Sequence, residues 1–126
     1  MKKIVVIDDD SAICESLKIL LSSVANVEIF DCLETARKYI RKEYRNIDLL
    51  IIDYNVGEES GISFYKKEII KNEIKLPAIL ISGFIVTQLK TPYELNKLDN
   101  LFLGVYEKPF DFIAFRKFVK NFLENS

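Results

Sequence analysis

Short apolar runs alternate along this chain with segments of helical periodicity, and this alternation constrains the fold more than any other feature of the sequence. Four of the runs are almost continuously apolar, as expected for parallel strands that are covered on both faces. They are residues 4–7, 49–52, 78–81 and 101–106. A fifth run, residues 27–30, alternates apolar and polar residues and therefore suits an edge strand. Strands that alternate with helices predict an α/β fold: a doubly wound, five-stranded parallel sheet with helices on both faces.

Apolar spacing and capping residues locate the helices between these strands. The expected helices cover residues 11–24, a segment from 31, residues 62–72, a short segment from about 91, and a last segment from 111. Asp10 or Ser11 can cap the first helix, and Asp31 with Glu34 forms a capping box at the start of the second. The last helix places these apolar side chains on one face: Phe112, Phe115, Val119, Phe122 and Leu123. Five strand–helix units account for the whole chain, so we expect one domain over residues 1–126.

Composition and charge exclude several classes of function. The 18 basic and 19 acidic side chains give a net charge of -1, so no overall positive field favours nucleic acid or an anionic membrane. The chain has no histidine, which excludes histidine-based chemistry and leaves carboxylates, hydroxyls and amines. Cys14 and Cys32 lack metal-ligand spacing and are expected to be small core-facing residues in a reducing cytosol. The first residues resemble neither a signal peptide nor a membrane span, so a cytoplasmic protein is expected.

Polar residues stand where the predicted strands end. They are Asp8, Asp9 and Asp10 after the first strand, Asp53 at the end of the third, Ser82 at the end of the fourth and Lys108 at the end of the fifth. In an open parallel sheet, ligands bind outside the carboxyl ends of the strands, where the strand order reverses. The sequence therefore predicts that these residues meet at one edge of the sheet.

Carboxylates that meet at one edge repel each other, so a member must take up a proton or the group must bind a cation. A small acidic set, with water and phosphate completing the shell, is how Mg²⁺ is usually held. Lys108 adds a positive charge and Ser82 adds a hydroxyl donor, and both could contact phosphoryl oxygens. An aspartate carboxylate in such a site can act as a nucleophile and form an acyl phosphate. Asp10 is better explained as a helix cap than as a ligand.

Four motifs carry a resemblance to a known family. They are residues 4–9 (IVVIDD), 50–55 (LIIDYN), 79–83 (ILISG) and 107–110 (EKPF). In this order, each closing a predicted strand, the motifs resemble those of response regulator receiver domains, and the resemblance spans the whole chain. It implies the flavodoxin-like strand order 2-1-3-4-5.

The resemblance also implies roles in metal binding. Asp53 would be the phosphoacceptor, and Asp9 and Asp53 would bind Mg²⁺ directly. Asp8 would act through a water molecule. The backbone carbonyl of Asn55 would supply a further ligand.

By the same resemblance, Ser82 and Lys108 match the phosphate-contacting hydroxyl and lysine, and the Lys108–Pro109 bond is expected to be cis. The chain would be a regulatory phosphoacceptor rather than an enzyme. It would receive its phosphoryl group from a sensor histidine kinase, a phosphotransfer protein or a small phosphodonor. Phosphorylation would then change its binding to a downstream protein, to a fused output domain or to a second copy in a dimer. No direct contact with nucleic acid or membrane is expected.

Three features depart from the family pattern. Gly57 stands where family members usually carry proline, so the loop after Asp53 is expected to be more mobile. Val105 holds the position of the family's switch aromatic. Tyr106 follows one residue later and is expected on the opposite face of its strand. The stretch between residues 82 and 108 is also longer than is typical of the family.

Two other functions stay open at this point. A haloacid-dehalogenase-type phosphatase would use Asp8 as nucleophile and Asp10 as acid. Against it, the chain has no room for a cap domain, Ala12 stands where threonine or valine is expected, and no acidic pair follows Lys108. An interaction module with the shape of a receiver that is never phosphorylated would explain the departures from the family pattern.

Overall fold

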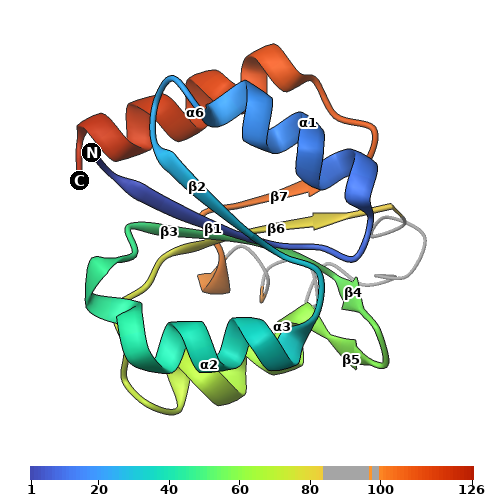
Figure 1. Ribbon diagram of the computed structural model, residues 1–126, viewed down its shortest axis with the longest axis vertical. Helices are drawn as coiled ribbons and strands as arrows, with labels where there is room; N and C mark the ends of the chain where they lie inside the picture. Colours follow the sequence, from blue (N-terminus) through green and yellow to red (C-terminus); the bar gives the residue numbers. More distant parts are fainter. Residues whose placement is uncertain (84–96, 98–99) are drawn as a thin grey trace.

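A five-stranded parallel sheet forms the middle layer of the protein (Figure 1). The computed structural model describes residues 1–83, 97 and 100–126. The strand order β2-β1-β3-β6-β7 confirms the predicted doubly wound sheet and the flavodoxin-like order. In chain order the strands are β1 (Lys3–Ile7), β2 (Asn26–Phe30), β3 (Leu49–Asp53), β6 (Ala78–Ser82) and β7 (Gly104–Glu107).

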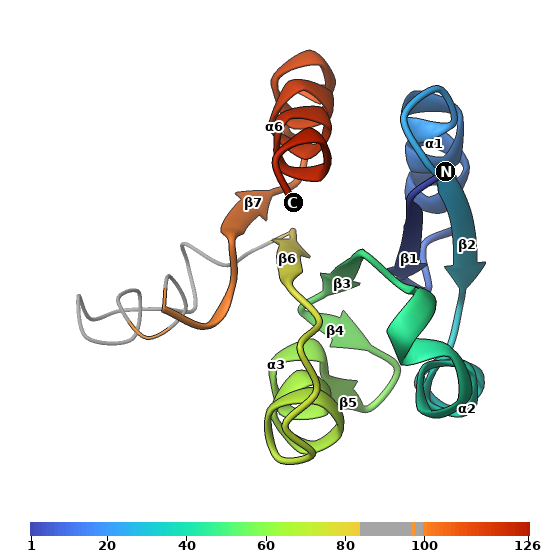
Figure 2. The same ribbon diagram turned by 90° about the vertical axis from the view of Figure 1, so that its left-hand side faces the viewer.

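Helices cover both faces of this sheet (Figure 2). On one face lie α1 (Ser11–Leu21) and α6 (Phe112–Glu124), and on the other lie α2 (Leu33–Glu43) and α3 (Gly61–Tyr65). The π-helical segment η2 (Lys66–Ile70) continues α3, and together they occupy most of the predicted third helix. No helix in the part of the chain that the structure describes is long and apolar enough to cross a membrane.

Alternate side chains of the central strands fill two cores. On β1, Ile4 and Val6 pack with α1 and α6. Val5 and Ile7 pack on the opposite side with α2 and α3. All four side chains are fully buried. The central strands therefore consist of continuous apolar runs because both of their faces are covered, whereas β2 lies at the sheet edge, as its alternation predicted.

The start of α2 differs from the sequence prediction. The helix begins at Leu33 with Cys32 as its N-cap and no side-chain cap hydrogen bond, so the predicted capping box of Asp31 and Glu34 is wrong. Cys32 keeps extended backbone angles (φ -145°, ψ 155°), because the chain is still leaving β2 at this point. Cys32 is only half-buried there while Cys14 is buried, so the prediction of a core-facing cysteine is confirmed for Cys14 alone.

The first helix has the predicted cap and an earlier end. Asp10 Oδ1 accepts hydrogen bonds from the backbone amides of Ala12 and Ile13 at 3.0 and 3.4 Å. The helix ends at Leu21, earlier than the predicted residue 24. After the helix, the backbone amides of Val24 and Ala25 both donate to the Leu21 carbonyl oxygen at 3.0 Å, the first with the spacing of a 3₁₀ turn. The short helix predicted from about residue 91 lies outside the described residues.

The last strand and helix place their aromatic side chains on defined faces. β7 begins at Gly104, later than the predicted residue 101. Val105 packs with the α2–α3 core and Tyr106 with the α1–α6 core, which confirms that they point to opposite faces. The apolar face predicted for the last helix suggests a core position for Phe112, but Phe112 is 37% exposed in the first turn of α6, so for this residue the prediction is wrong.

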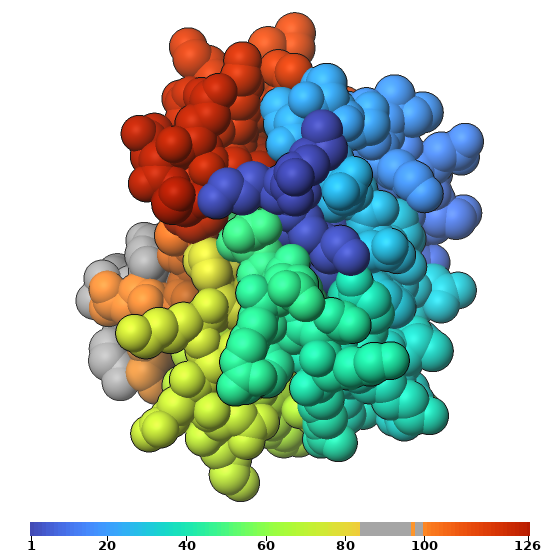
Figure 3. Space-filling model, turned by 60° about the vertical axis from the view of Figure 1, so that its left-hand side comes forward, coloured from blue at the N-terminus to red at the C-terminus, as the bar shows by residue number. Residues whose placement is uncertain are grey.

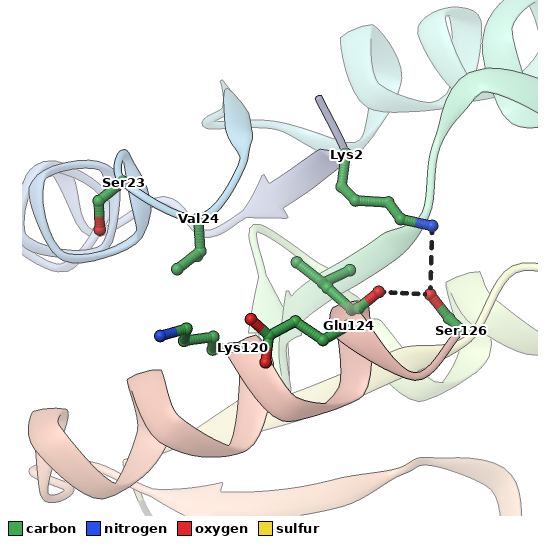
Figure 4. A pocket seen from close by; sticks show the side chains of 7 residues that line it. Lys2, Ser23, Val24, Lys120, Glu124 and Ser126 are labelled. Carbon is green, nitrogen blue, oxygen red and sulfur yellow. Dashed lines mark hydrogen bonds between the residues drawn. The ribbon is translucent and has the colours of Figure 1, made fainter.

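The two chain ends lie near the amino edge of the sheet (Figure 1), and the blue first residues lie beside the red last helix in Figure 3. Lys2 Nζ donates to Ser126 Oγ at 3.4 Å, and Ser126 Oγ donates to the Leu123 carbonyl oxygen at 3.0 Å (Figure 4). These residues, with Lys120, line an open hollow of about 390 Å³. Because this hollow lies at the opposite end of β1 from Asp8, it is separate from the edge where the sequence predicts a site.

Candidate metal centre at the carboxyl edge of the sheet

Polar residues from four strand ends line one cavity at the carboxyl edge of the sheet. Parallel pairing of β1 with β3, of β3 with β6 and of β6 with β7 makes all four strands end at this edge. The cavity has a volume of about 360 Å³, and its lining residues are Asp8, Asp9, Asp10, Asp53, Asn55, Ser82, Gly83 and Lys108. The residues that the sequence singled out at separate strand ends therefore lie together.

Three carboxylates in this cavity lie close enough to share a cation. Asp8, Asp9 and Asp53 each contribute one oxygen atom, and these atoms lie within 4.8 Å of one another. Asp8 is fully buried and Asp53 is 7% exposed, whereas Asp9 faces solvent. A compact set of oxygen ligands with one side open to water is the arrangement that Mg²⁺ prefers in proteins. The residues present therefore fit a hard divalent cation.

Both carboxylate oxygens of Asp8 are engaged by the protein. Oδ1 accepts a hydrogen bond from the backbone amide of Asp10 at 2.9 Å, and Oδ2 accepts one from Lys108 Nζ at 2.7 Å. The Cys14 thiol also donates to the backbone carbonyl of Asp8, at 3.2 Å. The bonds from the Asp10 amide and from Lys108 are charge-assisted. Such bonds are short and directional, so they fix the orientation of the buried Asp8 carboxylate.

Lys108 bridges the two buried carboxylates. Its Nζ lies 2.7 Å from Asp8 Oδ2 and 3.4 Å from Asp53 Oδ1. Its backbone amide donates to the carbonyl oxygen of Ser82 at 2.6 Å, and the following bond to Pro109 is cis, as predicted. Burial lowers the pKa of Lys108, but the hydrogen bonds and charges of Asp8 and Asp53 outweigh burial and raise it above its usual value. The lysine is therefore held as a cation.

The site lacks enough positive charge to balance its carboxylates. The pKa of Asp53 is raised from 3.8 to about 6, first by burial and then by the charge of Asp8, while Lys108 acts in the opposite direction. Further positive charge beside Asp53 would therefore favour its ionised form. A divalent cation held by the three carboxylates would supply that charge.

The loop after Asp53 forms a small hairpin that the sequence analysis did not predict. Its strands are β4 (Asn55–Val56) and β5 (Glu59–Ser60), which pair antiparallel. Gly57 in the turn has a φ of 66°, in the left-handed region that glycine adopts without strain. Its amide donates to Asp9 Oδ2 at 3.4 Å. Asn55 is therefore held at the rim of the cavity by a folded element.

A second glycine allows the backbone of α3 to approach β3 closely. A Cβ atom placed on Gly61 would lie 2.0 Å from the backbone carbonyl oxygen of Asp53, so no larger residue fits without movement of the backbone. The Gly61 amide also donates to the carbonyl oxygen of Tyr54 at 2.7 Å. The sequence signal for this contact is a glycine at the start of a predicted helix, directly after a polar loop.

Comparison with known proteins places the chain in a family. The family model described as the response regulator receiver domain matches residues 4–120. The chain is 33% identical over 89 residues to the transcriptional regulatory protein ComA of Bacillus subtilis (strain 168), a match that covers 68% of this chain and 41% of that protein. It is 29% identical over 127 residues to the transcriptional regulatory protein CrdR of Helicobacter pylori, covering 98% of this chain and 56% of that protein. The chain thus spans about half the length of these curated relatives.

Solved receiver domains share the fold. The receiver domain of the Francisella response regulator 1452 matches with a TM-score of 0.83 at 22% identity, covering 99% of this chain and 98% of that one. The receiver domain of a putative Luxo repressor protein from Vibrio parahaemolyticus matches with a TM-score of 0.82 at 15% identity, covering 98% and 91%. Because the relatives are regulators, the alternative of a haloacid-dehalogenase-type phosphatase is wrong. The chain belongs to the response regulator receiver domain family of two-component systems, whose members accept a phosphoryl group on an aspartate.

Proposed function

We propose that this chain accepts a phosphoryl group on Asp53 with Mg²⁺ bound beside it, and that phosphorylation changes its binding to a partner. The observation that carries the proposal is the meeting of three carboxylates with Lys108 in one cavity. Asp53 closes the fully buried strand β3, so its carboxylate is presented from a rigid element. Catalysis of group transfer depends on such positioning.

The metal site follows from the same cavity. Asp9 and Asp53 bind Mg²⁺ directly, Asp8 acts through a water molecule, and Asn55 contributes its backbone carbonyl. When bound, Mg²⁺ supplies positive charge that offsets the repulsion between the carboxylates and an incoming phosphoryl group. An Asp53 carboxylate oxygen attacks the phosphorus atom, and the leaving group of the donor departs with the bonding electron pair.

Lys108 and Ser82 contact the phosphoryl group in this proposal. Lys108 Nζ lies 3.4 Å from Asp53 Oδ1, so a fixed cation stands beside the acceptor atom. Ser82 is fully buried and lines the same cavity, where its hydroxyl can donate to a phosphoryl oxygen. Donors aimed at developing negative charge in a water-poor site are worth more than in solvent.

The wider role extends the same proposal. Residues 1–126 form one receiver domain that works in the cytoplasm and takes its phosphoryl group from a sensor histidine kinase, a phosphotransfer protein or a small phosphodonor. Its own catalysis is limited to its phosphorylation and slow dephosphorylation. The output is binding to a downstream protein, a fused output domain or a second copy in a dimer. ComA and CrdR, both longer than this chain, are named as transcriptional regulatory proteins.

Labelling with acetyl phosphate, followed by intact-mass spectrometry, tests the proposal. Wild type should gain one phosphoryl group in Mg²⁺ and none in EDTA, and Asp53→Asn should gain none. Asp10→Asn is the matched control, because Asp10 lines the cavity but lies outside the cluster of three, and asparagine remains a good helix cap. The control should label as wild type does.

Two results would contradict the phosphoacceptor assignment. Label on Asp53→Asn equal to wild type would place the acceptor elsewhere. No label on wild type, together with no binding of beryllofluoride in Mg²⁺, would instead support the interaction module that is never phosphorylated. The cluster of carboxylates and the neighbouring Lys108 favour phosphorylation.

A further inference from the structure

Arg37 links the β4–β5 hairpin, which follows Asp53, to the helical segments α2 and η2. Each nitrogen of the Arg37 guanidinium pairs with a different carboxylate. The pairs are Nε with Glu68 Oε1 at 2.6 Å, Nη1 with Glu34 Oε2 at 3.0 Å and Nη2 with Glu59 Oε2 at 3.2 Å. These partners belong to η2, α2 and β5 respectively. The arginine therefore connects three separate parts of the fold.

Several contacts hold the side chain of Arg37 and its partner Glu68 in place. Its side chain is 22% exposed, and the Glu68 carboxylate that it binds is 8% exposed. Arg41 also donates to Glu68, at 3.0 and 3.2 Å. The guanidinium carbon lies 5.4 Å from the centre of the Phe64 ring. Partly buried, multiply bonded ion pairs hold their geometry better than single exposed pairs.

The third partner, Glu59, lies on the hairpin that borders the metal centre. Glu59 is paired with Val56 in the β4–β5 ladder, and the neighbouring pair contains Asn55. Lys67 Nζ also lies 3.5 Å from Glu59 Oε1. A displacement of Glu59 would therefore also move the backbone of Asn55, through the pairing of β4 with β5.

Val56 anchors the base of this hairpin in the core, where its side chain is 3% exposed, but the turn beyond it is open. A Cβ atom placed on Gly57 would meet no atom of the described residues within 4 Å. The turn contacts the acidic cluster through one long hydrogen bond, from the Gly57 amide to Asp9 Oδ2 at 3.4 Å. Glycine places no restriction of its own on the backbone. The ion pair at Glu59 is thus a restraint on a segment that is weakly restrained at its tip.

We propose that Glu59 and Arg37 are positioning residues for the metal centre, since their ion pair holds the β4–β5 hairpin where the Asn55 carbonyl and the Gly57 amide meet the acidic cluster. The inference rests on the proposed function, because it concerns the same Mg²⁺ site. Neither side chain touches the ion. Their effect is on the geometry of the backbone that borders it.

The direction in which Arg37→Gln changes the affinity for Mg²⁺ distinguishes a positioning role from a long-range effect of charge. Arg37→Gln removes a positive charge, which by charge alone would strengthen binding of Mg²⁺. If the arginine positions the hairpin, the same substitution weakens binding. We expect Arg37→Gln and Glu59→Ala each to raise the Mg²⁺ dissociation constant about threefold to fivefold, as for loss of one partly exposed ion pair. The double variant should bind Mg²⁺ no more weakly than the single variant with the larger dissociation constant, because both substitutions break the same ion pair.

Isothermal titration calorimetry with MgCl₂ on the whole chain measures these constants, and the NMR signal of the Gly57 amide reports the hairpin directly. Glu34→Ala is the matched control, since it removes a carboxylate from the same guanidinium without touching the hairpin. Its dissociation constant should stay within about 1.5-fold of wild type. Glu59→Gln keeps a hydrogen-bond acceptor for Arg37, so its Mg²⁺ dissociation constant should lie between those of wild type and Glu59→Ala.

The outcomes separate this inference from the proposed function. If wild type binds Mg²⁺ but Glu59→Ala binds it equally well, or Arg37→Gln binds it more tightly, the positioning role is overturned while the phosphoacceptor proposal stands. If wild type binds neither Mg²⁺ nor beryllofluoride, the proposed function itself fails. Should Arg37→Gln fail to fold because Glu68 loses a partner, Glu59→Ala and Glu59→Gln decide alone.

Discussion

Replacing Asp53 with asparagine should stabilise the metal-free protein at neutral pH, although it removes the proposed phosphoacceptor. The ionised carboxylate of Asp53 is buried beside Asp8, and the single cation of Lys108 does not offset the cost, so the pKa of Asp53 is raised from 3.8 to about 6. Asparagine keeps the shape and a hydrogen-bonding oxygen but cannot ionise. The substitution therefore removes a repulsion that exists in the folded state only.

The size and sign of the effect follow from the two pKa values. One pKa unit corresponds to about 1.4 kcal/mol, so the interval from 3.8 to about 6 corresponds to about 3 kcal/mol. Because the folded-state pKa lies above the unfolded one, protonated Asp53 favours the folded state. This contribution to the free energy of unfolding is fully present below about pH 4 and is lost as the pH rises through about 6. The free energy of unfolding of Asp53→Asn should therefore exceed that of wild type by about 3 kcal/mol above pH 7, and this difference should fall towards zero as the pH is lowered from about 6 to about 4.

Urea unfolding in EDTA between pH 4 and pH 8, followed by circular dichroism, measures this difference. The control is the same series in saturating Mg²⁺, where wild type alone should gain stability, by about 2.7 kcal/mol at a Mg²⁺ concentration 100 times its dissociation constant. If the stabilities of wild type and Asp53→Asn run parallel over the whole pH range in EDTA, the carboxylate repulsion inferred from the burial of Asp53 is refuted.

Three further substitutions or reactions test local features of the fold. Gly61→Ala should lower the free energy of unfolding by at least about 2 kcal/mol in urea titration, because its Cβ would overlap a backbone carbonyl of β3. Asp10→Ala should cost about 1 kcal/mol in the same assay, because the first turn of α1 loses its cap. In the folded protein at pH 7, Cys32 should react with a maleimide at least about ten times faster than Cys14, as read by mass spectrometry of peptides. Burial raises the pKa of the Cys14 thiol to about 11, whereas a hydrogen bond with the Thr35 hydroxyl lowers that of Cys32.

The sheet and the place of the candidate site could be predicted because both follow from short-range patterns. Strands covered on both faces appear as continuous apolar runs, and β1, β3 and β6 all carry this pattern. Once three such strands are parallel, their carboxyl ends meet at one edge. Asp8, Asp53 and Ser82 therefore converge without any knowledge of the packing.

Other features depend on neighbours that are distant in the sequence. The β4–β5 hairpin has strands of two residues each, too short for any periodicity. The links from Arg37 to Glu59 and Glu68 depend on how α2 packs against α3 and η2. The capping box predicted from Asp31 failed because the exit of the chain from β2 decides where α2 begins. Local patterns thus located the strand ends but not the contacts between loops and helices.

The position of Tyr106 bears on how a change at Asp53 could reach the surface. The register of β7 places Val105 beside Leu80 and Tyr106 beside Ile81, so the two side chains face different helical layers. The Tyr106 ring is packed against Phe115, with ring centroids 4.9 Å apart, and moving it to the other layer would break this packing. The apolar side chain that β7 contributes to the α2–α3 layer is thus the aliphatic Val105.

Among the described residues, the β4–β5 hairpin offers a different connection from Asp53 to the helices. It begins two residues after Asp53, and it contacts Asp9 through Gly57. It is also joined to the α2 and η2 helices through the ion pair of Glu59 with Arg37. A rearrangement at the acidic cluster would therefore act on a polar link that can form and break, whereas the aromatic packing around Tyr106 stays intact. Two departures from the family pattern therefore belong together in this chain. Val105 removes the aromatic side chain from the α2–α3 layer, and the hairpin that contains Gly57 is attached to that layer by the ion pair of Glu59 with Arg37.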